Sequence, residues 1–156
     1  METVERELVF TLKDQLLIFQ SLSDQEMEYI LPHFEIRFCK SGDALFTEGD
    51  PSGFISFILA GKLEVKKGTE FAGTPIVLGT LNKGSFIGET ALISDNEPRA
   101  ATAIALEDTQ VLVLSNESLE SIIQKHPETG AKILKELLKF VSFRLIKALE
   151  KLAATF

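Results

Sequence analysis

The chain has 156 residues, of which 45% are apolar and 25% are charged. This size and composition are typical of one globular domain, and no apolar run reaches the length of a membrane span. Lysine and arginine number 16 against 23 aspartates and glutamates, for a net charge of −7, which opposes binding to nucleic acid. The residues after Met1 contain no apolar leader. We therefore expect a cytoplasmic protein with neither a nucleic-acid nor a membrane partner.

Residues 1–33 predict a helical lead-in. Ser23 stands three residues before Glu26, which is the spacing of a capping box, and a helix that begins there should end near Pro32. The apolar residues that recur near helical spacing are Leu8, Leu12, Leu16, Phe19, Met27, Ile30 and Leu31.

Residues 34–114 change to short apolar runs that are separated by Gly, Asp, Asn and Pro. The predicted strands are residues 34–39, 44–47, 54–59, 62–67, 76–81, 101–106 and 109–114. Strands at this regular spacing are typical of a sandwich or barrel. We expect an α+β fold: an antiparallel β-roll of the jelly-roll (double-stranded β-helix) type, flanked by N-terminal helices and a long C-terminal helix. The single cysteine, Cys39, has no disulfide partner and is interpreted as structural or incidental.

Residues 115–156 return to helical periodicity. Ser115 and Asn116 are good N-caps, and Pro127 begins the last helix where proline costs least. Its apolar residues step by four and three along Leu134, Leu138, Val141, Leu145, Leu149 and Leu152. Such a seam indicates a homodimer helix that is partly zipped like a coiled coil. The alternative is an amphipathic helix that lies along its own roll.

Residues 84–103 carry the chemistry. A short helical turn after Gly88 would present free amides to an anion, and Glu89 adds a hydrogen-bond acceptor. Arg99 offers a planar set of donors suited to a phosphate, and the small Ala100 and Ala101 let the backbone come close. These parts together indicate a pocket for a phosphate joined to a hydroxyl-bearing sugar.

This segment resembles the phosphate-binding cassette of cyclic-nucleotide-binding domains. That family includes bacterial cyclic-AMP receptor transcription factors, protein kinase A regulatory subunits and cyclic-nucleotide-gated channels. The cassette runs glycine, glutamate, any residue, alanine, leucine, a variable loop, then arginine, a small residue and alanine. Residues 88–92 and 99–101 match every position, and residues 46–50 and 57–61 resemble the flanking strands and turns. The resemblance covers residues 16–149.

The resemblance implies a role for each cassette residue. Glu89 would accept a hydrogen bond from the ribose 2′-hydroxyl and Arg99 would pair with the cyclic phosphate, with amides near Gly88, Ala91 and Ala100 completing the phosphate site. The implied ligand-binding residues are Phe86, Ile87, Gly88, Glu89, Thr90, Ala91, Arg99, Ala100 and Ala101. Thr90 stands where many members carry an aliphatic residue.

The identity of the base is less constrained. Members that prefer guanine often carry a hydroxyl residue after the arginine, where this chain has Ala100, so cyclic AMP is favoured over cyclic GMP as the ligand. In the bacterial members a residue of the dimer helix meets the adenine, and here the candidates are Ser142 and Arg144. No cofactor or metal is required beyond the nucleotide.

The cassette residues also have purely structural interpretations. Glu89 could stabilise a helix N-terminus, and Arg99 could form an ion pair with Glu89, Asp95 or Glu97. Taken together and in this order, however, the residues favour a nucleotide pocket.

Other functions fit the sequence less well. A metal-dependent enzyme on a similar roll would need several histidines, and only His33 and His126 occur. We expect no catalysis and, without a helix-turn-helix after the last helix, no DNA binding. Two alternatives stay open: a ligand-free dimerisation or partner-docking module, and a cyclic dinucleotide sensor. The favoured hypothesis is a cyclic-nucleotide sensor that acts through the C-terminal helix on a dimer or partner surface.

Overall fold

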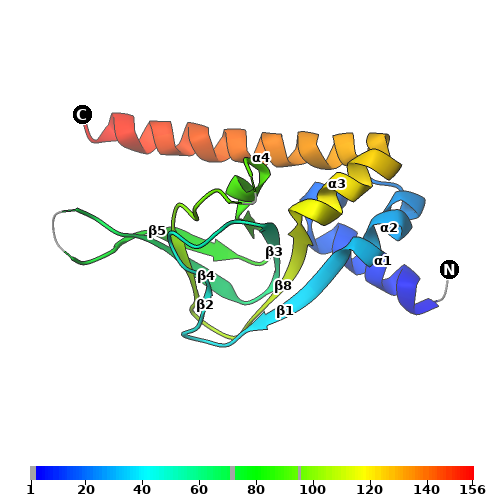
Figure 1. Cartoon of the computed structure of the whole chain (residues 1–156), viewed down its shortest axis with the longest axis horizontal. Coiled ribbons are helices and arrows are strands. Elements are labelled where there is room, and N and C mark those ends of the chain that lie inside the picture. The colour runs from blue at the N-terminus through cyan, green and yellow to red at the C-terminus, as the bar shows by residue number, and fades with distance from the viewer. Residues whose placement is uncertain (1–2, 71–72, 95) are drawn as a thin grey trace.

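Two four-stranded antiparallel sheets form a β-roll (Figure 1). The computed structural model describes residues 3–70, 73–94 and 96–156. The strands are β1 (Phe34–Cys39), β2 (Ala44–Phe46), β3 (Phe54–Ala60), β4 (Lys62–Lys67), β5 (Ile76–Asn82), β6 (Phe86–Ile87), β7 (Thr102–Ala105) and β8 (Thr109–Ser115). One sheet has the order β1-β8-β3-β6 and the other β2-β7-β4-β5. The predicted antiparallel β-roll is confirmed.

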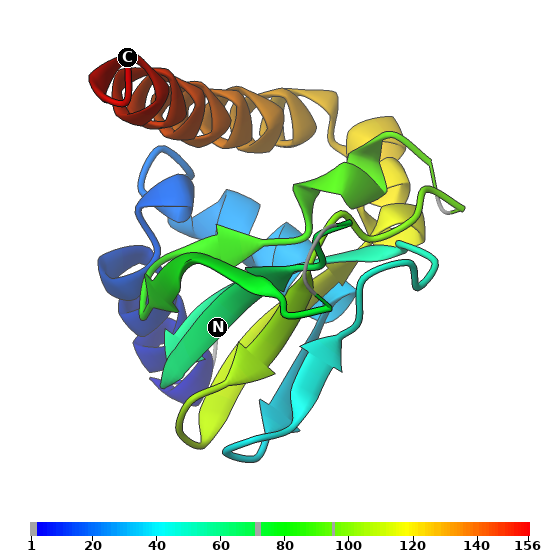
Figure 2. The same cartoon turned by 90° about the vertical axis from the view of Figure 1, so that its left-hand side faces the viewer.

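Helices flank the roll at one end and along one side. They are α1 (Thr3–Gln15), α2 (Asp24–Ile30), α3 (Asn116–Lys125) and α4 (Pro127–Ala154), with the 3₁₀ helices η1 (Leu17–Phe19), η2 (Leu31–His33) and η3 (Glu89–Leu92). In Figure 1, α1, α2 and α3 gather at one end, and α4 runs from there along the roll to the opposite end. Figure 2 shows α4 passing above the sheets. No helix in the described part of the chain is long and apolar enough to cross a membrane.

The central strand β8 packs on both of its faces. Leu112 and Leu114 point to a core shared with the helices, whereas Val111 and Val113 belong to a second core inside the roll. Because successive side chains of a strand point to opposite faces, an uninterrupted apolar run is what a strand buried on both sides needs. The run in the sequence therefore places β8 between the helices and the interior of the roll.

Local signals set the helix boundaries. Ser23 and Glu26 form the predicted capping box, each side chain bonding to the backbone of the other residue. The Ser115 side chain accepts from the amide of Ser118 and caps α3, while Pro127 stands in the first turn of α4. The predicted strands all form with bounds within one residue, but the two-residue β6 was missed because so short a strand leaves no periodic pattern.

The two histidines and the cysteine lie at the ends of secondary-structure elements. His126 joins α3 to α4 without a side-chain cap bond, and its ring stacks on Tyr29 at 4.1 Å. His33 ends η2, and burial lowers its pKa, with help from the charges of Lys125 and His126. Cys39 is buried at the end of β1, and burial raises the pKa of its thiol.

The two halves of α4 differ in burial. Ile133 and Leu137 of the first half are buried in the helical core. The apolar residues that remain largely exposed are Leu138, Phe143, Leu145, Ile146, Leu149 and Leu152. The predicted apolar seam therefore exists, but most of it does not cover this chain's own roll.

Candidate ligand-binding site

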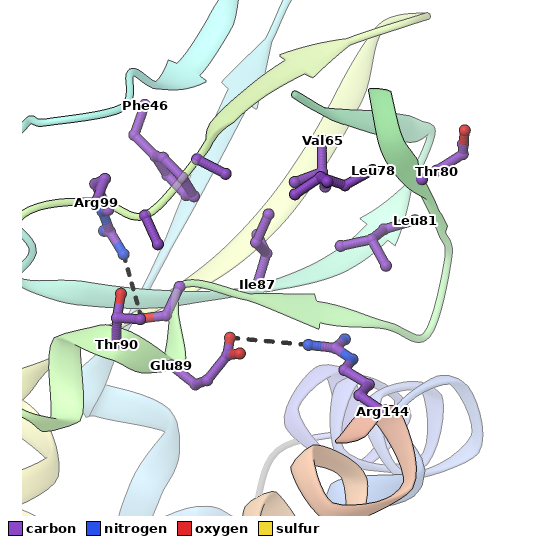
Figure 3. A pocket seen from close by; sticks show the side chains of 14 residues that line it. Phe46, Val65, Leu78, Thr80, Leu81, Ile87, Glu89, Thr90, Arg99 and Arg144 are labelled. Atoms are coloured by element: carbon purple, nitrogen blue, oxygen red, sulfur yellow. Dashed lines mark hydrogen bonds and ion pairs between the residues drawn. The ribbon is translucent and has the colours of Figure 1, made fainter. Parts of the chain in front are cut away.

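A cavity of about 280 Å³ opens between the roll, η3 and α4 (Figure 3). It is lined by Phe46, Val65, Leu78, Gly79, Thr80, Leu81, Ile87, Gly88, Glu89, Thr90, Arg99, Ala100, Ala101 and Arg144. One side consists of residues 87–90 and 99–101, and another of the β4–β5 hairpin. Arg144 reaches in from α4 (Figure 3).

The backbone of Arg99 is fixed by the turn after β2. The Arg99 amide donates to the carbonyl of Asp50 at 2.8 Å, and the Gly49 amide donates to the carbonyl of Arg99 at 2.9 Å. Further along the same loop, the amide of Ser52 donates to the carbonyl of Glu97 at 2.8 Å. These bonds join residues 97–99 to residues 49–52. They therefore fix the position of the Arg99 backbone, from which its side chain extends.

The Arg99 side chain is buried, and no carboxylate among the described residues contacts its guanidinium directly. Only 2% of the residue is exposed, and its Nη1 and Nη2 donate to the carbonyls of Gly88 at 3.2 Å and Phe54 at 2.9 Å. The buried Nε has no hydrogen-bond partner in the part of the chain that the structure describes. Burial lowers the Arg99 pKa, while the charges of Glu89 and Asp50 raise it. A guanidinium remains protonated in proteins, so the site holds a positive charge with donors to spare.

The structural interpretation of Arg99 as an ion-pair partner is not supported. Within the described residues, no carboxylate oxygen, including those of Glu89 and Glu97, lies within 4.0 Å of its guanidinium. Asp95, the third candidate, lies outside the described residues.

Gly88 can be no other residue without disturbing Arg99. Its φ is +95°, a conformation that side chains rarely adopt, and it precedes the first turn of η3. A Cβ atom at this position would lie 2.6 Å from Nη1 of Arg99 and 2.9 Å from the carbonyl oxygen of Phe54. The glycine therefore allows the close approach of backbone and guanidinium.

Glu89 and Arg144 connect η3 to α4. Nη1 of Arg144 lies 3.8 Å from a carboxylate oxygen of Glu89, and Nη2 donates to the Ser85 hydroxyl at 2.9 Å and the Phe86 carbonyl at 2.5 Å. The guanidinium also lies 4.3 Å from the centroid of the Phe86 ring. Burial lowers the Arg144 pKa, and the charge of Glu89 raises it. Arg144 is thus the residue through which α4 contacts the cavity.

A sequence model of a known protein family matches most of this chain. The sequence model of the cyclic nucleotide-binding domain matches residues 36–126, more than half of the chain. The chain belongs to the cyclic nucleotide-binding domain family. The family resemblance seen in residues 84–103 is confirmed.

Relatives in this family differ in their overall organisation. The cyclic AMP receptor protein of Thermus thermophilus is 30% identical over 110 residues, which are 70% of this chain and 50% of that protein. Human cGMP-dependent protein kinase 2 is 35% identical over 108 residues, 68% of this chain and 14% of the kinase. This chain thus spans half or less of these curated relatives.

A solved structure covers nearly the whole chain. The cyclic nucleotide-binding domain from Methylobacillus flagellatus has a TM-score of 0.84 and 26% identity, covering 95% of this chain and 85% of that one. The flanking helices as well as the roll are therefore shared with a cyclic nucleotide-binding domain.

The structure brings most of the predicted ligand-binding residues to the cavity. Phe86 and Ala91 are exceptions: both belong to the helical core, and the Ala91 amide donates to the Gly88 carbonyl at 3.0 Å. Thr90 lines the cavity, and its hydroxyl lies 3.5 Å from that of the buried Ser52. Of the two candidates on α4, Arg144 lines the cavity, whereas Ser142 is exposed and does not.

The sequence did not predict the largely apolar wall that β2, β4 and β5 contribute to the cavity. The cavity-lining residues that it did not single out are Phe46, Val65, Leu78, Gly79, Thr80 and Leu81. The sequence carries one signal for this wall, the apolar run at 76–81, and the structure adds that Ile76, Val77 and Leu78 are each more than 50% exposed. An exposed apolar strand beside a cavity is a candidate binding surface.

A metal centre has no basis in the described residues. No group of three or more histidines, cysteines, aspartates or glutamates among them is placed to hold a metal ion.

Proposed function

We propose that this domain is a cyclic-nucleotide sensor that prefers cyclic AMP and acts by regulation rather than catalysis. Arg99 binds the cyclic phosphate, and Glu89 accepts a hydrogen bond from the ribose 2′-hydroxyl. The proposal rests on one observation above all: a buried arginine with an unpaired Nε lines the cavity beside a glycine that leaves room for it. A buried cation with no described carboxylate within 4.0 Å favours an anionic ligand.

The charge of the cavity supports a cyclic phosphate over an open one. Glu89, Arg99 and Arg144 are the charged side chains that line it, and their formal charges sum to one positive charge. A cyclic phosphodiester carries one negative charge, whereas a phosphate monoester carries about −1.5 to −2 at neutral pH. The carboxylate of Glu89 would repel the additional charge.

The preference for adenine rests on the residue that follows Arg99. Ala100 follows Arg99 and lines the cavity, so no side-chain hydroxyl is available there for a guanine amino group. The relatives include a cyclic AMP receptor protein and a cGMP-dependent protein kinase, so the base must be assigned by experiment.

The decisive experiment is calorimetric titration of the purified chain with cyclic AMP. Cyclic GMP, cyclic di-GMP and linear 5′-AMP serve as comparators. We expect saturable binding of cyclic AMP that Arg99→Ala weakens by about 2 to 5 kcal/mol, the range for truncating one partner of a buried charge pair. No heat with any nucleotide would identify a ligand-free docking module, and preference for cyclic di-GMP a dinucleotide sensor. Equal affinity in parent and Arg99→Ala would overturn the site.

The output of the sensor is proposed to be a homodimer surface on α4. Leu138, Leu145, Leu149 and Leu152 are each more than half exposed and lie on one stripe of the helix. A stripe of this length that no described element covers is typical of a helix that pairs with a second copy. Analytical ultracentrifugation at tens of micromolar, with and without cyclic AMP, tests this: a monomer in both conditions would refute it.

Two contacts provide a route from ligand to helices. Asn116, at the start of α3, donates its side-chain amide to the Ala91 carbonyl in η3, and Arg144 joins α4 to Glu89. A ligand that contacts Glu89 therefore acts directly on the residue that pairs with α4, in the same 3₁₀ helix whose Ala91 holds α3. It can shift their arrangement only by as much as its affinity differs between the two arrangements.

A further inference from the structure

Two phenylalanine rings form a corner around the Arg99 guanidinium. Its Cζ lies 4.1 Å from the centroid of the Phe46 ring and 4.6 Å from that of Phe54. The two rings are 6.4 Å apart and nearly perpendicular, at 72°. Phe46 belongs to β2 and Phe54 to β3, so the two sheets of the roll each contribute one wall.

The two rings help to compensate for the cost of burying the Arg99 charge. A buried guanidinium needs compensation, which a carboxylate usually supplies. Here, within the described residues, the direct contacts of the guanidinium are two backbone carbonyls and two ring faces. Carbonyl dipoles and ring quadrupoles stabilise a cation without a formal negative charge. The positive charge is offset only by the carboxylates of Glu89 and Asp50, neither of which lies within 4.0 Å, and it can therefore still act on a ligand.

We propose that Phe46 and Phe54 are positioning residues for Arg99, which hold its guanidinium toward the ligand phosphate by ring stacking instead of by an ion pair. The inference rests on the proposed function, since it concerns the same arginine. Two of the five guanidinium N–H groups are used by the Gly88 and Phe54 carbonyls, and the rings restrict the plane in which the other three can point.

Phe54 provides the cleaner test because it is not among the residues that line the cavity. A change in its ring can therefore reach the ligand only through its neighbours, and its carbonyl bond to Arg99 belongs to the backbone. We expect Phe54→Leu to weaken cyclic AMP binding about tenfold, the size of a desolvated cation–π contact. Phe54→Tyr, which keeps the ring, should bind within about twofold of the parent.

A double-mutant cycle distinguishes positioning from general loss of packing. In an Arg99→Gln background the cation is gone, so Phe54→Leu should weaken binding by less than about twofold further. Arg37 supplies a matched control: its guanidinium lies 4.7 Å from the same Phe54 ring, yet Arg37 does not line the cavity. Arg37→Ala should leave the affinity unchanged.

Each outcome of the cycle is informative. If the parent binds no cyclic nucleotide, the proposed function fails. If the parent binds and Phe54→Leu binds equally well, or loses the same factor in both backgrounds, only the positioning role fails. Circular dichroism and thermal melting establish that each variant is folded. Should Phe54→Leu not fold, Phe46→Leu in the same cycle decides, because any direct contribution of Phe46 to the ligand is present in both backgrounds and cancels in the comparison.

Discussion

The cassette side and the hairpin side of the cavity are built in opposite ways. On the cassette side, Arg99 is buried, and hydrogen bonds within the chain hold its backbone and side chain. On the hairpin side, β5 is an edge strand, and Leu78 is 53% exposed. The polar side is therefore organised by the fold, whereas the apolar side still has surface to bury.

This difference suggests a division of work in binding. Preorganised donors give a site its selectivity for phosphate, because their orientation is fixed at no cost to the ligand. An exposed apolar wall contributes free energy roughly in proportion to the area that a base would cover. The cassette should thus decide which chemical group binds, and the hairpin should decide how tightly any nucleoside is held.

The largest expected effect comes from Gly88→Ala, which attacks the cassette side. The new Cβ would meet both Arg99 and the Phe54 carbonyl, and the residue would be held at positive φ, which costs about 1–2 kcal/mol of stability. Because Arg99 must move, we expect cyclic AMP affinity to fall at least about as far as in Arg99→Ala, by 2 kcal/mol or more. Calorimetric titration measures the loss.

Gly42→Ala is the matched control for this change. Gly42 has nearly the same φ, +89°, but a Cβ there would meet nothing within 4 Å. It should therefore lose stability and keep its affinity. Equal affinity losses in the two variants would mean that backbone strain, and not the contact with Arg99, governs binding.

A smaller effect is expected from Leu78→Ala on the hairpin side. The change removes apolar surface that a base would cover, so we expect about a tenfold loss of affinity, near 1.4 kcal/mol. The loss should be the same for cyclic AMP and for adenosine, whereas Arg99→Ala should affect cyclic AMP far more than adenosine. Val77→Ala is the control, because Val77 is 52% exposed on the same strand but does not line the cavity. An unchanged affinity in Leu78→Ala would remove the hairpin from the site.

The same contrast explains what sequence alone could predict. Gly88, Glu89 and Arg99 lie within twelve residues and form a local pattern. Their chemistry could therefore be predicted from the sequence alone. Val65 and Leu78 line one cavity only because β4 pairs with β5. Their residue types are those of any buried strand, and periodicity cannot reveal that Leu78 lies on an edge strand that leaves it exposed.

The sequence also could not predict which face of α4 turns toward the cavity. Ser142 and Arg144 are two residues apart, so a helix cannot turn both toward one cavity. Which of the two enters depends on how Ile133 and Leu137 pack into the core, a property of the assembled fold. The strands and the capping box at Ser23, by contrast, depend on neighbours in the sequence and were predicted closely.

The smallest effect on affinity is expected where α4 is anchored, far from both sides of the cavity. Glu26 of α2 accepts from Thr129 at 2.8 Å and pairs with Lys132 at 2.7 Å, both in the first turns of α4. Burial raises the pKa of Glu26, but hydrogen bonds from Lys132, the Ser23 amide and Thr129 outweigh it and lower the pKa from 4.5 to about 2. A carboxyl with a lowered pKa in the folded state stabilises the fold above its unfolded pKa and loses that contribution as the pH falls.

The Glu26 anchor therefore predicts a pH-dependent stability without a change in binding. Glu26→Gln should lower the free energy of unfolding by about 2 kcal/mol at pH 7, and the difference from the parent should shrink as the pH falls from about 4.5 through about 2. Urea unfolding at a series of pH values measures this. Glu150→Gln is the control, because the Lys147–Glu150 pair is exposed and contributes little. Cyclic AMP affinity at pH 7 should be unchanged in both variants; a loss in Glu26→Gln would show that the base of α4 belongs to the cassette side after all.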